Sequence, residues 1–141
     1  IILAADHATF ALPEIRSGTV ADAASIKLPK RIPYHIAMEM LLTGRWIDAE
    51  EAARWGLVNR VVAPEALLPT CLALAADMNS CVPEANRESK RLIDEGFALP
   101  FGEAMAREVA DATAWAQQVT GESVGDRRRG ILERGRAQSD D

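Results

Sequence analysis

A short apolar run opens the chain and limits the folds that it can adopt. Residues 1–5 are too few for most helices and have the composition of a buried strand. A parallel strand that is buried on both faces needs neighbouring strands at both of its edges. The run therefore predicts one strand of a larger sheet, in a chain whose later segments have helical periodicity.

A second extended segment ends at a proline and is followed by an acid. Residues 10–12 can pair as a strand, whereas Pro13 lacks an N–H and has a fixed φ, so pairing should stop there. Glu14 is then held at the end of a strand, on a stiff backbone and among apolar neighbours. A carboxylate shielded from water can exchange protons near neutral pH, so Glu14 is a candidate catalytic acid. From spacing alone, an exposed loop acid is the commoner alternative.

Two turn and capping signals follow this acid. Gly18 suits a tight turn or a close backbone approach, and residues 15–18 should turn the chain back. A short helix is expected over residues 20–26. Asp22 lies where it would cap that helix or occupy its first turn.

A longer helix with a wide apolar face is predicted over residues 34–42. Pro33 suits its first helical position, and Gly44 suits the position just after its end. The residues that should face the core are Ile36, Met40 and Leu41.

A capping box and a strand are expected next. Asp48 should accept a hydrogen bond from the amide of Glu51, while the Glu51 side chain reaches back. The helix over residues 49–55 should end at Gly56. Residues 57–62, which are rich in β-branched valine, should form a strand.

The rest of the chain predicts helices. They are expected over residues 64–80, 83–95, 102–119 and 122–141, and Pro69 should either end a first turn or kink the first of them. The buried stripe of the third helix should be Ala104, Met105, Val109, Ala112 and Ala116, with Asp111 on its outer face. The last helix is strongly basic in its middle.

Composition narrows the classes of function. A length of 141 residues is typical of one domain, and a net charge of −5 implies no general attraction to nucleic acid or anionic membranes. No apolar run approaches the ~20 residues that span a bilayer. Cys71 and Cys81 form neither a metal motif nor a disulfide framework, so we expect small core residues, no metal and a reduced cytoplasmic setting.

Six short segments occur in an order and spacing that is specific in combination, although each is weak alone. They are Phe-Ala-Leu-Pro-Glu at 10–14, Gly18, Lys-Leu-Pro-Lys at 27–30, Leu-Thr-Gly-Arg at 42–45, Asp-Ala-Glu-Glu-Ala at 48–52 and Gly-Leu-Val-Asn-Arg-Val-Val at 56–62. Together they resemble the crotonase (enoyl-CoA hydratase/isomerase) superfamily, and within it most resemble the carnitinyl-CoA dehydratase-like branch. Residues 64–141 resemble the family in helix pattern and placement more than in sequence.

The resemblance implies an α/β fold in two parts. Residues 1–62 would be the C-terminal part of a ClpP/crotonase-like spiral ββα core, and residues 63–141 a helical trimerisation region that covers CoA. Crotonase chains are considerably longer, and their preceding half carries most of the spiral, the amides that hold the thioester oxygen and a second catalytic Glu. We therefore expect an N-terminal half on the same or another chain, in a homotrimer or a dimer of trimers.

The resemblance also implies a reaction and a site. Water would be added to or removed from the α,β carbons of an acyl-CoA, with no metal or redox cofactor and with CoA only as the carrier of the substrate. Glu14 matches the family's second acid, and Leu12, Pro13 and Gly18 would bind the substrate. Asp22 stands where many crotonases have glycine. It would either add a carboxylate suited to a polar or cationic acyl group or simply cap its helix.

Other interpretations stay open. The same fold can serve double-bond isomerisation or thioester hydrolysis, and the chain can instead be a non-catalytic assembly fragment. The basic residues 27–31 would contact CoA phosphates or form a solvated turn. Lys90 and Arg91 match cations that face CoA in the family.

Overall fold

The structure is a computed structural model that describes residues 1–117, 128, 130–132 and 135–136. The chain forms two compact units, residues 1–80 and 81–141, where length alone predicted one domain. Each unit is described by itself. The functional boundary expected between residues 62 and 63 stays a prediction, and by its contacts the helix that follows residue 62 belongs to the first unit.

The strand predicted at the start of the chain is present, in a sheet of two short parallel strands. β1 (Leu3–Ala5) pairs with β4 (Arg60–Val62), with Leu3 opposite Arg60. Both strands are shorter than the runs that predicted them. Ile1 and Ile2 lie outside β1 and are exposed, because this sheet has only two strands in the described part of the chain.

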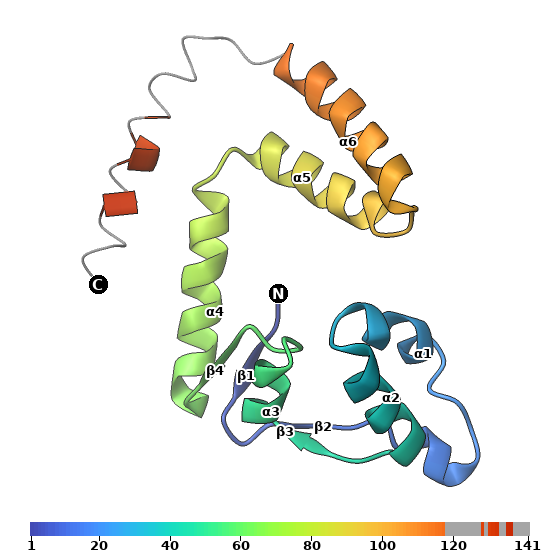
Figure 1. Cartoon of the computed structure of the whole chain (residues 1–141). Coiled ribbons are helices and arrows are strands. Elements are labelled where there is room, and N and C mark those ends of the chain that lie inside the picture. Colours follow the sequence, from blue (N-terminus) through green and yellow to red (C-terminus); the bar gives the residue numbers. More distant parts are fainter. Residues whose placement is uncertain (118–127, 129, 133–134, 137–141) are drawn as a thin grey trace. The chain divides into compact units, whose positions relative to one another are not determined.

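A two-residue antiparallel ladder leads to the candidate acid. β2 (Thr9–Phe10) pairs with β3 (Ile47–Asp48). In the first unit, this ladder lies between the β1–β4 sheet and the helices of residues 24–43 (Figure 1). Pairing stops before Pro13 as predicted, but it already ends at Phe10. A 3-10 helix, η1 (Pro13–Ser17), follows, so Glu14 lies in a helical turn rather than at a strand end.

The next helix is shorter than its prediction. α1 (Ala24–Lys27) begins four residues late, because Asp22 has a φ of +39° that a right-handed helix cannot include. A 3-10 turn, η2 (Leu28–Lys30), continues from α1.

α2 (Tyr34–Thr43) matches its prediction closely, with Pro33 at the N-cap and Gly44 closing the helix at a φ of +63°. α3 (Ala49–Arg54) follows β3 and ends before Gly56. The core lies among these elements. Its buried residues are Ala4, Leu28, Ile32, Ile36, Ala37, Met40, Ile47, Ala49, Ala52 and Val58, while Leu41 is only partly buried.

α4 (Pro64–Asn79) packs against β1 and runs through Pro69 without ending. None of its residues is buried, although its sequence has a helical apolar pattern. Leu68 and Leu72 are more than 60% exposed, and Cys71 is half-buried. The apolar pattern therefore predicted the helix correctly but not the burial of its apolar face within this chain.

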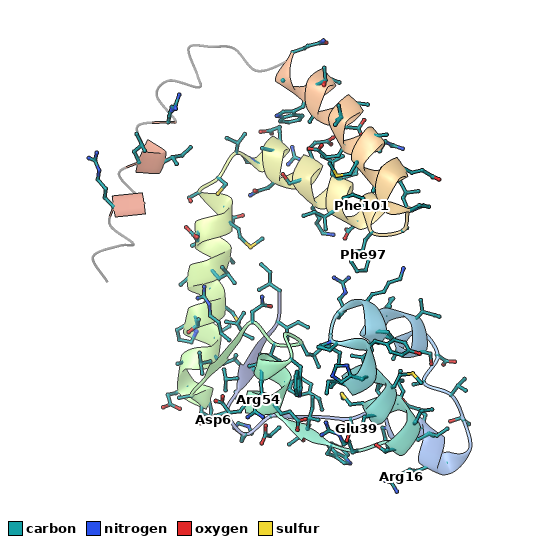
Figure 2. All side chains as sticks on the ribbon, in the orientation of Figure 1. Asp6, Arg16, Glu39, Arg54, Phe97 and Phe101 are labelled. Carbon is teal, nitrogen blue, oxygen red and sulfur yellow. The ribbon has the colours of Figure 1, made fainter. Side chains whose placement is uncertain are left out.

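The second unit contains a helical hairpin, α5 (Pro83–Gly96) and α6 (Phe101–Ala116), with Phe97 and Phe101 at the turn (Figures 1 and 2). The predicted buried stripe of α6 is wrong, since no residue of α6 is buried and Val109 is 57% exposed. The half-buried Asp111 faces α5 instead of solvent. Cys81 is exposed, so it is not a core residue.

The predicted basic helix over residues 122–141 lies largely outside the described residues, as does the predicted end of α6 at residues 118–119. Within the described chain, no single helix is long and apolar enough to cross a bilayer. α4 and α5 reach such a length and composition only when taken together across the break between them.

Candidate functional site

The backbone of Glu14 is fixed by the turn that follows it. Pro13 begins η1, where its missing N–H costs no hydrogen bond. The carbonyl oxygen of Glu14 accepts from the Ser17 hydroxyl at 2.8 Å, the Thr19 amide at 3.1 Å and the Thr19 hydroxyl at 3.2 Å. Gly18 lies between these donors with a φ of +83°, which confirms the predicted tight turn.

One oxygen of the Glu14 carboxyl group is buried without a hydrogen-bond partner among the described residues. This atom, Oε2, is shielded from solvent, while the residue as a whole is half-buried. Buried polar atoms normally form hydrogen bonds. A buried oxygen without one therefore indicates that a ligand, a water molecule or another part of the protein donates to it.

An apolar pocket is lined in part by the segment that ends two residues before this acid. It has a volume of about 340 Å³, within the range of small-molecule sites. Its lining residues are Phe10, Ala11, Leu12, Ala24, Lys27, Leu28, Arg31, Met40 and Leu57. The surface that these residues present is almost entirely apolar, so Lys27 and Arg31 contribute chiefly their hydrocarbon stems.

The predicted site residues are only partly brought together. Leu12 lines the pocket, and Pro13 and Glu14 follow it directly in η1. Gly18 and Asp22 lie in the two turns between η1 and α1 and are not among the lining residues.

The structure decides the capping alternative for Asp22. The N-cap of α1 is Ala23, and no side chain caps that helix, so the expectation that Asp22 caps or begins it is wrong. Its φ of +39° instead places Asp22 in backbone space that favours glycine, which agrees with its match to a family glycine.

Sequence reasoning missed a close contact that sets the position of η1. Gly44 is buried at the end of α2, and η1 packs against α2. A Cβ atom at Gly44 would lie 3.2 Å from Pro13 Cα and 3.3 Å from Arg16 Cγ. The prediction of Gly44 as a helix end was correct, but a C-cap motif carries no information about the tertiary neighbour.

Arg45, the next residue, joins α2 to α3. Its guanidinium donates to Glu51 at 2.6 and 3.1 Å and to Glu39 at 3.2 Å, and the indole of Trp55 also donates to Glu51 at 3.2 Å. The hydrogen bonds from Arg45 lower the pKa of Glu51. Figure 2 labels Glu39 on α2, at one end of this network.

The predicted capping box is therefore only half formed. Asp48 Oδ1 accepts from the Glu51 amide at 2.7 Å, as expected. The Glu51 side chain contacts Arg45 and Trp55 rather than reaching back to the helix start.

The cations expected to face CoA in the second unit have carboxylate partners. Lys90 pairs with Asp94, and Arg91 donates to Glu88, Glu95 and Asp111. Among the described residues, no three His, Cys, Asp or Glu side chains are grouped as metal ligands would be.

Known proteins resemble this chain in sequence and in structure. A family model described as enoyl-CoA hydratase/isomerase matches residues 1–125. A carnitinyl-CoA dehydratase of Citrobacter koseri is 44% identical over 103 residues, which cover 72% of this chain and 40% of that protein. One from Salmonella arizonae is 48% identical over 105 residues, covering 68% of this chain and 40% of that protein.

Solved structures agree on the fold. An enoyl-CoA hydratase from Bacillus anthracis superposes with a TM-score of 0.81 at 26% identity, covering 93% of this chain and 50% of that one. One from Mycobacterium marinum gives a TM-score of 0.79 at 31% identity, covering 95% and 52%.

The chain thus spans about 40% of the length of these curated relatives and about half of these solved structures. The α/β crotonase fold expected from the sequence is confirmed by the superpositions. With a family match over residues 1–125, the chain belongs to the crotonase (enoyl-CoA hydratase/isomerase) family.

Proposed function

We propose that the protein containing this chain adds water to an enoyl-CoA, or removes it from a hydroxyacyl-CoA such as carnitinyl-CoA, with Glu14 as one of two catalytic acids. Family membership and relatives that are carnitinyl-CoA dehydratases support the reaction class. One observation carries the residue assignment: Glu14 Oε2 is shielded and unpaired among the described residues, in the turn directly after a pocket-lining segment.

The chemistry follows from where charge and protons move. In hydration, the hydroxyl of water forms a bond to the β carbon and a proton forms a bond to the α carbon. Glu14 would deliver that α proton, or remove it in the reverse direction. Backbone N–H groups would stabilise the negative charge on the thioester oxygen, and a second Glu would act on the water; we place both in the N-terminal half of the enzyme.

The pocket suits part of an acyl-CoA. Its apolar wall, formed by residues such as Leu12 and Met40, fits an acyl chain or the pantetheine arm better than it fits phosphates. We retain Pro13 and Gly18 as residues that shape the turn beside it. Asp22 would supply a carboxylate for a cationic acyl group.

The remaining properties belong to the same proposal. The reaction uses no metal or redox cofactor, and CoA is only the carrier of the acyl group. The enzyme would act in the cytoplasm as a homotrimer or a dimer of trimers, and the N-terminal half would complete its site.

Substitution of Glu14 by Gln in the complete enzyme tests the assignment. The amide has nearly the same shape but cannot transfer the proton, so we expect kcat to fall by at least about a hundredfold while acyl-CoA binding is kept. Calorimetry measures acyl-CoA binding, and turnover is measured with crotonyl-CoA and with crotonobetainyl-CoA. The preferred substrate of the two also shows whether the enzyme acts as an enoyl-CoA hydratase or as a carnitinyl-CoA dehydratase. The matched control is Glu108→Gln, at an exposed acid on α6. Wild-type turnover in Glu14→Gln would refute the assignment.

A further inference from the structure

The end of α2 and the start of η1 touch at one glycine. Gly44 is buried with a φ of +63°, and its amide donates to the Met40 carbonyl at 2.9 Å to close the helix. At this point a side chain would meet backbone, since a Cβ would lie 3.2 Å from Pro13 Cα. Contacts of this length are tighter than ordinary van der Waals packing, so a neighbour must move by a few tenths of an ångström.

The two neighbours differ in their freedom to move. Arg16, whose Cγ and Nε would lie 3.3 Å from the new Cβ, is an exposed side chain that can rotate away (Figure 2). Pro13 Cα is main chain in a residue with fixed φ, and it precedes Glu14 directly. Relief of the contact therefore shifts the η1 backbone and carries Glu14 with it.

The end of α2, on which Gly44 lies, is also held in place. Arg45 is bound to Glu39 of α2 and to Glu51 of α3, so the end of α2 cannot easily recede from η1. The turn after Glu14 is held by three hydrogen bonds to its carbonyl oxygen. The missing side chain of Gly44 thus determines how close η1 lies to the core.

We propose that Gly44 is a positioning residue for catalysis, which sets the place of the Glu14 carboxyl group through backbone contact with Pro13. This inference rests on the proposed role of Glu14. Gly44 need not touch the substrate, and its effect is geometric: a small displacement of a proton-transferring group lowers the rate steeply.

The chain offers a matched control. Gly56 has a φ of +79°, but a Cβ there would have no atom within 4 Å. Alanine at Gly56 therefore suffers the same left-handed backbone strain as alanine at Gly44 without the steric contact. Comparison of Gly44→Ala with Gly56→Ala in the complete enzyme isolates the contact.

The expected result has three parts. Gly44→Ala lowers kcat by about tenfold with little change in KM, because binding groups stay in place while Glu14 moves. Gly56→Ala leaves kcat near the wild-type value. In the Glu14→Gln background, Gly44→Ala causes no further loss, since a residue that acts only through Glu14 has nothing left to position.

Each failure is distinct. Wild-type kcat in a folded Gly44→Ala enzyme, or an equal further loss in the Glu14→Gln background, overturns the positioning role and leaves the proposed function intact. Full activity of Glu14→Gln itself overturns both. If Gly44→Ala does not fold, Gly44→Asn carries the same test, because asparagine tolerates positive φ and still places a Cβ against Pro13.

Discussion

At the scale of single residues, two features bear on the proposed site. Glu14 has one shielded carboxyl oxygen that no described residue pairs, and Asp22 has a left-handed backbone at a φ of +39°. Both features are costly in a chain selected for stability alone, and such costs are concentrated at functional sites. The sequence could predict Glu14 as a candidate, because Pro13 and the apolar segment before it are visible in the sequence.

The proposed role of Asp22 in acyl-group choice is testable with two substitutions. Asp22→Asn removes the charge but keeps a residue that tolerates positive φ, so the fold should be unaffected. We expect the kcat/KM ratio for crotonobetainyl-CoA over crotonyl-CoA to fall by about tenfold, as for the loss of one weak ionic contact.

Asp22→Gly separates charge from backbone strain. Glycine accepts the observed φ without strain, so the melting temperature should not fall, and substrate preference should change as in Asp22→Asn. An unchanged preference in both variants would contradict a substrate contact and leave Asp22 as a turn residue.

At the scale of elements, the sequence predicted which helices form, and in what order, better than it predicted which of their residues are buried. The predictions of α2, α3, α4 and α5 hold within a few residues, because capping residues and periodicity are local signals. The buried stripe of α6 failed because burial requires a partner surface that periodicity cannot identify. The contact between Gly44 and Pro13 was equally unpredictable, since it joins segments about thirty residues apart whose approach only the folded chain defines.

Ion pairs rather than a buried core connect α5 to α6. Between the helices, Arg91 of α5 contacts Asp111 of α6 at 2.7 Å, and Arg107 of α6 contacts Glu95 of α5 at 3.0 Å. Within α6, Arg107 also contacts Asp111 at 2.9 Å. Hydrogen bonds from Arg91 lower the pKa of Glu88, and those from Arg91 and Arg107 lower the pKa of Asp111. Because both carboxyl pKa values are lower in the folded chain, the unfolded chain binds more protons in acid.

This linkage predicts that the hairpin loses stability in acid. The stabilisation is complete above the unfolded carboxyl pKa values, near pH 4, and is lost as pH falls through the folded values. Hydrogen exchange of amides in residues 83–116 should therefore show a smaller opening free energy at low pH. Asp111→Asn should flatten that dependence and Glu108→Gln should not. Equal slopes in the two variants would contradict the role of the ion pairs.

The hydrogen bonds of Arg45, which join α2 to α3, allow a matched test of their contribution to stability. Arg45→Lys keeps the charge but loses the two-pronged contact with Glu51, so we expect a melting temperature a few degrees lower. Arg54→Lys, at an exposed position on α3, is the control. An unchanged melting temperature in Arg45→Lys would show that the network adds little to stability.

At the scale of the whole molecule, large apolar side chains remain exposed in both units. Ile1, Leu68 and Leu72 are exposed in the first unit, and Phe101 and Val109 in the second. The chain also spans about 40% of the curated relatives named above and about half of the solved structures named there. We expect these apolar faces to pack against other protein in the enzyme proposed above.

The isolated chain of 141 residues should therefore be poorly soluble and should self-associate. Sedimentation of the purified chain, with dye binding to exposed apolar surface, measures this directly. A soluble monomer that unfolds cooperatively would contradict the expectation and would make the chain an independent folding unit.

In the proposed reaction, Glu14 moves a proton on the α carbon of a bound thioester. Hydration in deuterium oxide measures that step directly, because each turnover places one deuterium at the α carbon. We predict that mass spectrometry finds incorporation by the wild-type enzyme and its near-complete loss in Glu14→Gln, while calorimetry shows acyl-CoA still bound. Unchanged incorporation in the bound, folded variant would contradict the claim.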